Sequence, residues 1–192
     1  YSTILPDNAL VINFAAESHV DNSFKNVDAF IQANIVGLQK VIDYCLSKKS
    51  RLLHISTDEV YGEQIGAAVD EKHILSPTNP YSATKASGDL FVQTYIRCFG
   101  LDAKIVRANN IFGARQLIEK VIPKAMHQAI NDAEFYIHGD KALRRNFLHT
   151  SDFSNSLDFV VQKWEECPDK IFNIASEDEI CIRDLIERIY KF

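Results

Sequence analysis

Short apolar segments alternate with longer segments of helical periodicity along most of this chain. Strands are predicted at residues 10–16, 51–56, 104–107, 135–138 and 170–174. Apolar side chains recur at helical spacing in residues 27–48, 81–99, 118–130, 152–166 and 182–190. This alternation predicts an α/β fold built on a mostly parallel, doubly wound sheet. In such sheets ligands bind beyond the carboxyl ends of the strands.

Composition narrows the class of protein. With 192 residues, 46% of them hydrophobic, the chain can bury a sizeable core. Its formal net charge of -5 disfavours a general nucleic-acid binder, and no apolar run reaches the roughly 18–20 residues of a membrane span. Four cysteines without paired metal spacing favour a reducing, cytoplasmic setting and predict no metal site.

Reactive side chains gather where one predicted strand ends. The apolar residues 52–55 are followed by Ser56 and then by Thr57, Asp58 and Glu59. A hydroxyl and two carboxylates at the carboxyl end of a parallel strand predict a site for proton transfer. A simple turn would also explain Thr57 and Asp58. A catalytic role for them therefore requires partner residues elsewhere in the chain.

Tyr81 and Lys85 supply those partners. Pro80 precedes Tyr81 and an apolar-periodic segment follows it, so we expect Tyr81 in the first turn of a helix. Residues four apart share one face of a helix, which places the Lys85 ammonium beside the Tyr81 hydroxyl. There it is expected to favour the phenolate and lower a pKa that is ordinarily about 10.

The wider pattern resembles the extended short-chain dehydrogenase/reductase family, and within it the nucleotide-sugar 4,6-dehydratases of the dTDP-glucose type. Five segments carry the resemblance, in the family's order: NFAAESHVD at 13–21, ISTDEVYG at 55–62, PYSATKA at 80–86, NIFG at 110–113 with EKVIP at 119–123, and RNFL at 145–148. The Thr-Asp-Glu triplet is the most specific part, because related epimerases and decarboxylases usually carry other residues there.

The resemblance implies an incomplete NAD(P)-binding Rossmann-like domain across residues 1–192, with elements of a C-terminal substrate-binding lobe interleaved from about residue 108. The glycine-rich turn that holds the dinucleotide pyrophosphate in this family is absent, since the first glycine is Gly37. We therefore expect an internal part of a longer protein that binds NAD poorly by itself, and a homodimer when the protein is complete.

The resemblance also assigns roles to residues. Contacts with NAD are expected from Ala15, Ala16, Ser18, Ser56, Tyr81 and Lys85. Contacts with a nucleotide-diphosphate sugar are expected from His19, Thr57, Asn110, Lys120, Val121, Arg145 and Asn173. A structural role for His19 and surface positions for Asn110, Lys120 and Arg145 are the alternatives.

The implied reaction converts dTDP- or UDP-glucose to the 4-keto-6-deoxy sugar. Tyr81, supported by Lys85, takes the proton of the 4-hydroxyl while C4 gives a hydride to NAD. Glu59 then removes the C5 proton, Asp58 protonates the departing 6-hydroxyl, and Thr57 holds the 4-oxygen. The hydride finally returns from NADH to C6, which regenerates NAD. A nucleotide-sugar epimerase or decarboxylase of the same family, or a catalytically inactive fragment, are the other possibilities.

Overall fold

The computed structural model describes residues 6–63, 68–137 and 144–192. It consists of two compact units. The first unit contains Tyr1–Ala108 and Cys167–Asn173, and the second contains Asn109–Glu166 and Ile174–Phe192. Assignment of these units to cofactor and substrate binding stays a prediction.

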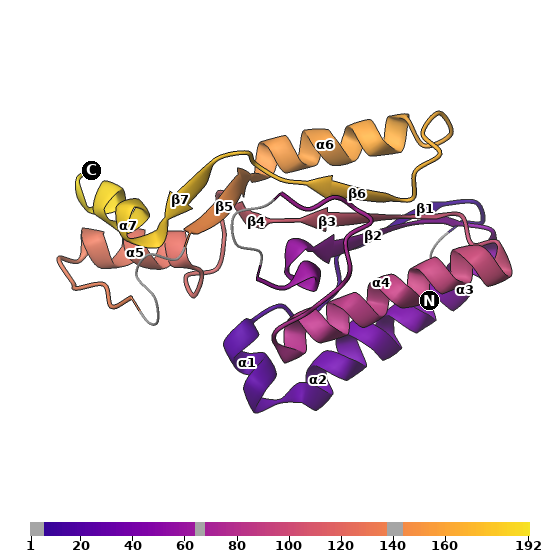
Figure 1. The fold of residues 1–192 in the computed structure, drawn as a ribbon, viewed down its shortest axis with the longest axis horizontal. Coiled ribbons are helices and arrows are strands. Elements are labelled where there is room, and N and C mark those ends of the chain that lie inside the picture. The colour runs from indigo at the N-terminus through magenta and orange to yellow at the C-terminus, as the bar shows by residue number, and fades with distance from the viewer. Residues whose placement is uncertain (1–5, 64–67, 138–143) are drawn as a thin grey trace. The chain divides into compact units, whose positions relative to one another are not determined.

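A parallel sheet forms the centre of the first unit (Figure 1). Its strand order is β1-β2-β3-β6, and β2 pairs in parallel with both β1 and β3. The strands are β1 (Leu10–Asn13), β2 (Arg51–Thr57), β3 (Ala103–Ala108) and β6 (Ile171–Ile174). Because β1 and β2 run in the same direction, the residues that follow Asn13 and Thr57 leave the sheet at one edge.

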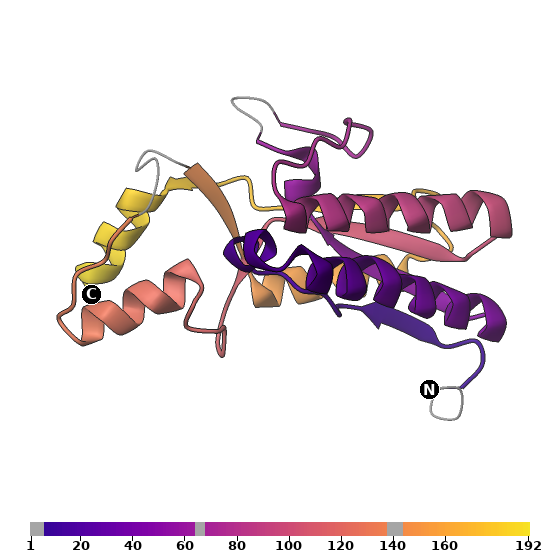
Figure 2. The same ribbon diagram turned by 90° about the horizontal axis from the view of Figure 1, so that it is seen from below.

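Helices cover one face of this sheet, and α3 and α4 lie side by side in both views (Figures 1 and 2). The helical segments of the first unit are α1 (Val20–Lys25), α2 (Val27–Ile31), the π-helical turn η1 (Gln32–Gly37), α3 (Leu38–Lys48), the 3-10 turn η2 (Asp58–Tyr61) and α4 (Pro80–Phe99). The core between helices and sheet is apolar and includes Leu38, Ile42, Leu52, Val92 and Ile105. Burial of side chains of this size stabilises the fold by roughly 1.5–3 kcal/mol each.

The second unit has a smaller mixed sheet of order β4-β5-β7. Strand β5 pairs in parallel with β4 and antiparallel with β7. Its elements are β4 (Asn110–Phe112), α5 (Val121–Ile130), β5 (Arg144–His149), α6 (Thr150–Gln162), β7 (Glu179–Cys181) and α7 (Ile182–Tyr190). Helices α5 and α7 pack against each other.

The structure confirms the predicted α/β class and its mostly parallel sheet. It corrects several local predictions. The first strand ends at Asn13 instead of residue 16, and the helix expected over residues 27–48 is interrupted by η1. The strand expected at residues 135–138 is wrong for 135–137, which are irregular, and residue 138 lies outside the described residues.

The sequence pattern predicts none of the elements α1, β4, β5 and β7. Strands β4 and β7 have three residues each, which is too short for an apolar alternation to be recognised. Strand β5 has the sequence RRNFLH, in which two apolar residues stand next to each other and therefore show no alternation. Cross-strand pairing, which the local sequence does not encode, forms these strands.

Candidate active site

The turn after β2 fixes the two carboxylates. Thr57 caps η2, because its Oγ1 accepts a hydrogen bond from the Glu59 backbone N–H at 3.3 Å. The same hydroxyl donates to Asp58 Oδ1 at 3.1 Å. Thr57 is buried and both carboxylates are half-buried. The cap therefore holds Asp58 and Glu59 in adjacent positions directly after the strand, as the sequence predicted.

Gly62 closes this turn. Its φ is +75°, and a Cβ at this position would lie 2.1 Å from the carbonyl oxygen of Ser76. A side chain would therefore clash with the backbone as well as strain the left-handed conformation. The residue fixes the path of the chain immediately after the two carboxylates.

Helix α4 begins beside the same turn. Asn79 is its N-cap and forms a capping box with Ser82, and Pro80 is its first residue. The Asn79 side chain also donates from Nδ2 to Glu59 Oε2 at 3.2 Å. Glu59 is thus held by the start of α4, whereas Asp58 is held by Thr57. This difference in partners gives the two neighbouring carboxylates distinct surroundings.

Tyr81 lies in the first turn of α4, as predicted from Pro80, and its side chain is 9% exposed. Its ring makes an edge contact with Phe30, with 6.3 Å between ring centroids. The structure corrects the prediction for its pKa: burial and the Glu59 carboxylate raise the pKa of Tyr81 above 10, while a hydrogen bond with Thr57 opposes the rise. Tyr81 therefore keeps its proton at neutral pH in this structure.

Lys85 shares the buried face of α4 with Tyr81, but its ammonium contacts the sheet. Nζ donates to the Ile55 carbonyl oxygen at 2.6 Å. Burial lowers the Lys85 pKa to about 8, and the Asp89 carboxylate opposes this shift. The side chain is consequently a cation at neutral pH that sits next to the end of β2.

Asn34 is a site residue that the sequence analysis missed. It lies in η1 and is 3% exposed. Its Oδ1 accepts from Glu17 N at 2.9 Å, and its Nδ2 donates to Glu17 O at 3.0 Å and to Thr84 Oγ1 at 2.9 Å. One amide therefore connects the segment after β1 to the turn of α4 between Tyr81 and Lys85. The available signal was an asparagine on the apolar face of this helical stretch, four residues after Phe30 and four before Leu38.

The segment after β1 carries the remaining residues predicted to bind the cofactor. Ala15, Ala16 and Ser18 are exposed there. His19 is the N-cap residue of α1, but its side chain makes no capping hydrogen bond. Its buried Nδ1 has no hydrogen-bond partner among the described residues. Ser56, at the end of β2, is buried; its hydroxyl makes no hydrogen bond of regular geometry with described residues, although it lies near enough to Asp89 to affect that carboxyl's pKa.

These features fit a ligand rich in hydroxyl groups, such as the ribose of a dinucleotide. The Lys85 ammonium has three donors, and the described part of the chain gives it one hydrogen bond. The small side chains of Ala15 and Ala16 allow close approach at the sheet edge. Among the described residues, no cluster of three His, Cys, Asp or Glu side chains could hold a metal ion.

Four of the predicted substrate-binding residues belong to the second unit. Asn110 begins β4 and donates from Nδ2 to Asn146 O at 3.2 Å, and Arg145 lies in β5 with Nη1 donating to Arg144 O at 3.1 Å. Lys120 caps α5, and Val121 is its first residue. Their roles in substrate binding stay predictions.

Asn173, in β6 of the first unit, makes hydrogen bonds to other residues of the same unit. Its Oδ1 accepts from the Tyr61 hydroxyl at 2.8 Å, its Nδ2 donates to Val69 O at 3.2 Å, and its backbone N–H donates to Glu71 Oε1 at 2.8 Å. These bonds give Asn173 a structural role, and its contact with substrate stays a prediction.

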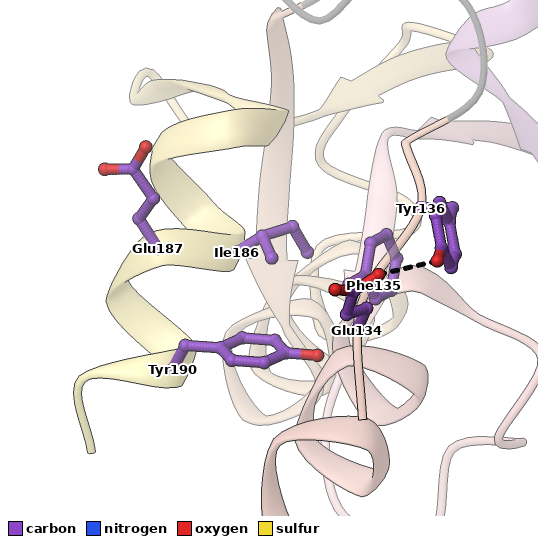
Figure 3. A pocket seen from close by; sticks show the side chains of 6 residues that line it. All are labelled: Glu134, Phe135, Tyr136, Ile186, Glu187 and Tyr190. Carbon is purple, nitrogen blue, oxygen red and sulfur yellow. Dashed lines mark hydrogen bonds between the residues drawn. The ribbon is translucent and has the colours of Figure 1, made fainter. Parts of the chain in front are cut away.

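The second unit also has a shallow hollow of about 360 Å³, which Figure 3 shows. It is lined by Glu134, Phe135, Tyr136, Ile186, Glu187 and Tyr190. The Tyr136 hydroxyl donates to Glu134 Oε2, which raises the pKa of Tyr136, and the Tyr190 hydroxyl donates to Ala133 O. None of the predicted site residues lines this hollow.

The parallel sheet, the Thr57–Glu59 cap and the Tyr81–Lys85 pair define an extended short-chain dehydrogenase/reductase. Residues 4–191 match the family model described as GDP-mannose 4,6 dehydratase. The chain belongs to this family. The predicted resemblance to nucleotide-sugar 4,6-dehydratases is thereby confirmed.

Individual relatives agree with this assignment. A dTDP-D-glucose 4,6-dehydratase of Dictyostelium discoideum is 38% identical, over 94% of this chain and 44% of its own length. A dTDP-glucose 4,6-dehydratase of Streptomyces antibioticus is 35% identical, over 91% of this chain and 52% of its own length. The chain therefore spans about half the length of the curated relatives it matches.

Solved structures share the fold. The dTDP-glucose 4,6-dehydratase DesIV of Streptomyces venezuelae, with NAD and TYD bound, has a TM-score of 0.90 at 32% identity and covers 95% of this chain and 56% of its own. A UDP-glucuronic acid 4-epimerase variant of Bacillus cereus also has a TM-score of 0.90, at 27% identity, covering 99% of this chain and 61% of its own. The fold alone thus does not separate dehydratase from epimerase.

Proposed function

We propose that the protein containing this chain dehydrates a nucleotide-diphosphate glucose, dTDP- or UDP-glucose, to the 4-keto-6-deoxy sugar with NAD as its cofactor. The observation that carries the proposal is the pair of adjacent carboxylates, Asp58 and Glu59, held by different partners beside Tyr81. Two carboxylates in unlike surroundings can take opposite protonation states, as an acid and a base must.

NAD, when bound, would accept a hydride from the sugar and return it later in the reaction. Ala15, Ala16, Ser18, Ser56, Tyr81 and Lys85 are the residues proposed to hold it. The structural support is the set of exposed small residues after β1 and the available donors of Lys85. Solved relatives with NAD bound add to this support.

Tyr81 removes the proton of the sugar 4-hydroxyl, and Thr57 holds the 4-oxygen. Burial and Glu59 raise the Tyr81 pKa, so a positive charge that approaches its hydroxyl would favour the phenolate. Lys85 is the cation available on the same face of α4, one turn further along. Approach of its ammonium from the Ile55 carbonyl toward Tyr81 would supply that charge.

Glu59 removes the C5 proton, which the neighbouring 4-ketone makes acidic, and Asp58 protonates the 6-hydroxyl as it leaves as water. The hydrogen bond from Asn79 holds the Glu59 side chain at the start of α4. His19, Asn110, Lys120, Val121, Arg145 and Asn173 are proposed to bind the nucleotide-diphosphate part, and two cations among them suit a diphosphate.

An epimerase is the second candidate, because the UDP-glucuronic acid 4-epimerase shares the fold equally well. The experiment that separates them supplies the full-length protein with dTDP- or UDP-glucose labelled at carbon 6 and identifies products by mass spectrometry. Loss of the mass of one water, with a 4-keto group in the product, is expected. Recovery of an epimer that keeps its 6-oxygen would reject the dehydratase proposal.

A homodimer is also part of the proposal. Apolar side chains are exposed on two helical segments that pack against each other, α2 and α4: Val27, Ile31, Leu90 and Phe91. A second copy of the chain would cover this surface. The four cysteines are free, which agrees with a reducing compartment, and a cytoplasmic location stays a prediction. No helix among the described residues is long and apolar enough to span a membrane.

A further inference from the structure

A fully buried ion pair lies behind Lys85. Asp89, in α4, and Arg107, in β3, are 0% and 2% exposed, and Arg107 Nε donates to Asp89 Oδ2 at 2.7 Å. Arg107 Nη1 also donates to the Tyr61 hydroxyl at 2.7 Å and to the Glu71 carbonyl oxygen at 3.1 Å. Its guanidinium group lies over the Tyr61 ring, 4.9 Å from the centroid. Arg107 is thus fixed on several sides, and it fixes Asp89.

Asp89 is four residues after Lys85, so both side chains lie on the same buried face of α4. The Asp89 carboxylate acts on the Lys85 ammonium through its charge. The other titratable groups near Lys85 are Tyr81 on its own helix and His54 on β2. Tyr81 is neutral in this structure, so Asp89 is the anion whose charge acts on Lys85. Burial raises the pKa of Asp89 itself, and the charges of Arg107 and Lys85 oppose that rise.

His54 contributes no charge. Burial, assisted by the Lys85 charge, lowers its pKa well below the usual value. Its Nδ1 lies 3.3 Å from Asn13 Nδ2, an amide donor, so the proton of the neutral ring belongs on Nε2. That nitrogen faces Asp89 Oδ1 at 3.9 Å. His54 therefore presents a neutral N–H to the carboxylate that Arg107 already holds.

Stability alone gives no reason for this arrangement, because well-packed apolar residues stabilise a core as well as a buried ion pair or better. Resting on the proposed function, we propose that Asp89, anchored by Arg107, is a positioning residue whose charge keeps Lys85 protonated on the buried face of α4 that also carries Tyr81. Asp89 then acts on the reaction through Lys85 and touches neither substrate nor cofactor.

The test measures the Lys85 pKa directly. Full-length protein labelled with carbon-13 at the lysine ε position is titrated by NMR, and Lys85→Arg assigns the signal. The double variant Asp89→Leu/Arg107→Met removes the pair without leaving a buried charge alone. The Lys85 pKa, about 8 in the unmodified protein, is expected to fall by about one unit or more, because an opposite charge nearby shifts a pKa by roughly 1–3 units.

The exposed pair Arg51–Asp102, at the other end of β2, provides the matched control. Arg51→Gln/Asp102→Asn removes one ion pair and is expected to leave the Lys85 pKa unchanged. Asp89→Glu keeps the carboxylate and is expected to keep the pKa near that of the unmodified protein. If the double variant fails to fold, Asp89→Asn gives a second reading. It removes the carboxylate charge but keeps an oxygen that can accept from Arg107, and the Lys85 pKa should fall at least as far because the Arg107 charge stays. A Lys85 pKa that stays unchanged without the Asp89 carboxylate overturns the proposal.

Activity gives the second measurement. If the protein dehydrates a nucleotide sugar, loss of the Asp89 charge should move the alkaline limb of the kcat/KM profile to lower pH by the same shift that NMR reports, whereas a purely structural pair would lower kcat/KM equally at all pH values. Absence of any turnover by the unmodified protein would reject the proposed function, and the NMR titration would still decide the role of Asp89.

Discussion

Asn79 Nδ2 donates a hydrogen bond to Glu59 Oε2 at 3.2 Å, while Asn79 Oδ1 accepts one from Ser82 N at 2.8 Å. One amide side chain thus caps the helix that carries Tyr81 and also holds the proposed C5 base. The position of the base is thereby coupled to the start of α4.

This coupling predicts the effect of Asn79→Ala. Loss of the cap should lower the free energy of unfolding by about 1 kcal/mol, measured by urea denaturation. Asn26→Ala is the matched control, because Asn26 caps α2 with its side chain and has no bond to a carboxylate of the site. Both variants should lose similar stability, but only Asn79→Ala should also lower kcat. Equal kcat values in the two variants would contradict the coupling.

The division of labour between Tyr81 and Glu59 predicts two different defects. Tyr81→Phe should block hydride transfer, because the 4-hydroxyl proton then has no base. Glu59→Gln should permit oxidation at C4 but slow loss of water by about 10²- to 10⁴-fold, so that NADH and a 4-keto sugar with its 6-oxygen accumulate on the enzyme. Single-turnover absorbance with mass spectrometry of quenched samples distinguishes them.

Glu63→Gln serves as the control for the Glu59 substitution, since Glu63 is exposed and lies four residues further along the chain. It should turn over at the rate of the unmodified enzyme. If Glu59→Gln forms the 4-keto-6-deoxy sugar at that same rate, Glu59 is not the C5 base and the dehydratase proposal loses its most specific support.

Lys85 predicts how stability depends on pH. Its folded pKa of about 8 is below its ordinary value of 10.5, so between these values the unfolded chain binds more protons than the folded one. Stability should therefore rise with pH in this window. The gain from pH 8 to pH 10 should be about 2 kcal/mol larger in the unmodified protein than in Lys85→Met.

Above pH 10 the trend should reverse, because the raised pKa of Tyr81 makes the folded chain keep a proton that the unfolded chain loses. Chemical denaturation at a series of pH values measures both effects. A pH dependence of unfolding that is identical in Lys85→Met and the unmodified protein would show that the buried lysine has an ordinary pKa.

Asn34→Leu should release the segment after β1. The substitution keeps a similar branched shape but removes three hydrogen bonds, two to the Glu17 backbone and one to Thr84. Each bond contributes roughly 0.5–1.5 kcal/mol, and the segment carries Ala15, Ala16 and Ser18. We expect faster amide exchange in residues 14–19 and a weaker affinity for NAD, measured by calorimetry on the full-length protein. Unchanged exchange there would refute the role of Asn34.

If the protein is a dimer through α2 and α4, a charge introduced on the exposed face of α4 should dissociate the dimer. Phe91→Glu introduces a carboxylate where a second copy would bury an apolar ring, so multi-angle light scattering should give the mass of a monomer. Ile130→Glu is the control, because Ile130 is exposed in the second unit and lies outside this face. A monomer already in the unmodified full-length protein would refute the dimer.

Local chemistry made much of the site predictable. Pro80 marks the first turn of α4, and the polar residues after Ile55 mark the end of β2, so the positions of Tyr81 and the two carboxylates followed from their neighbours in sequence. The Tyr81 pKa could not be predicted from those neighbours, because the burial of Tyr81 and the nearby Glu59 charge depend on packing between segments about twenty residues apart. Asp89 and Arg107 also carry no local signal, because only the pairing of α4 with β3 brings them together.

The π-helical turn η1 makes the structure depend on how many residues lie between α2 and α3, and not only on which residues these are. A π turn holds one residue more than the α-helical turn it replaces, so deletion of a single residue from Gln32–Gly37 would restore regular α-helical winding with little rotation of α2 relative to α3, and it would remove the bulge in which Asn34 lies. Asn34 could then no longer face Glu17 and Thr84 at once. A deletion there should therefore release the segment after β1, as Asn34→Leu is expected to do, while α2 and α3 keep their buried faces.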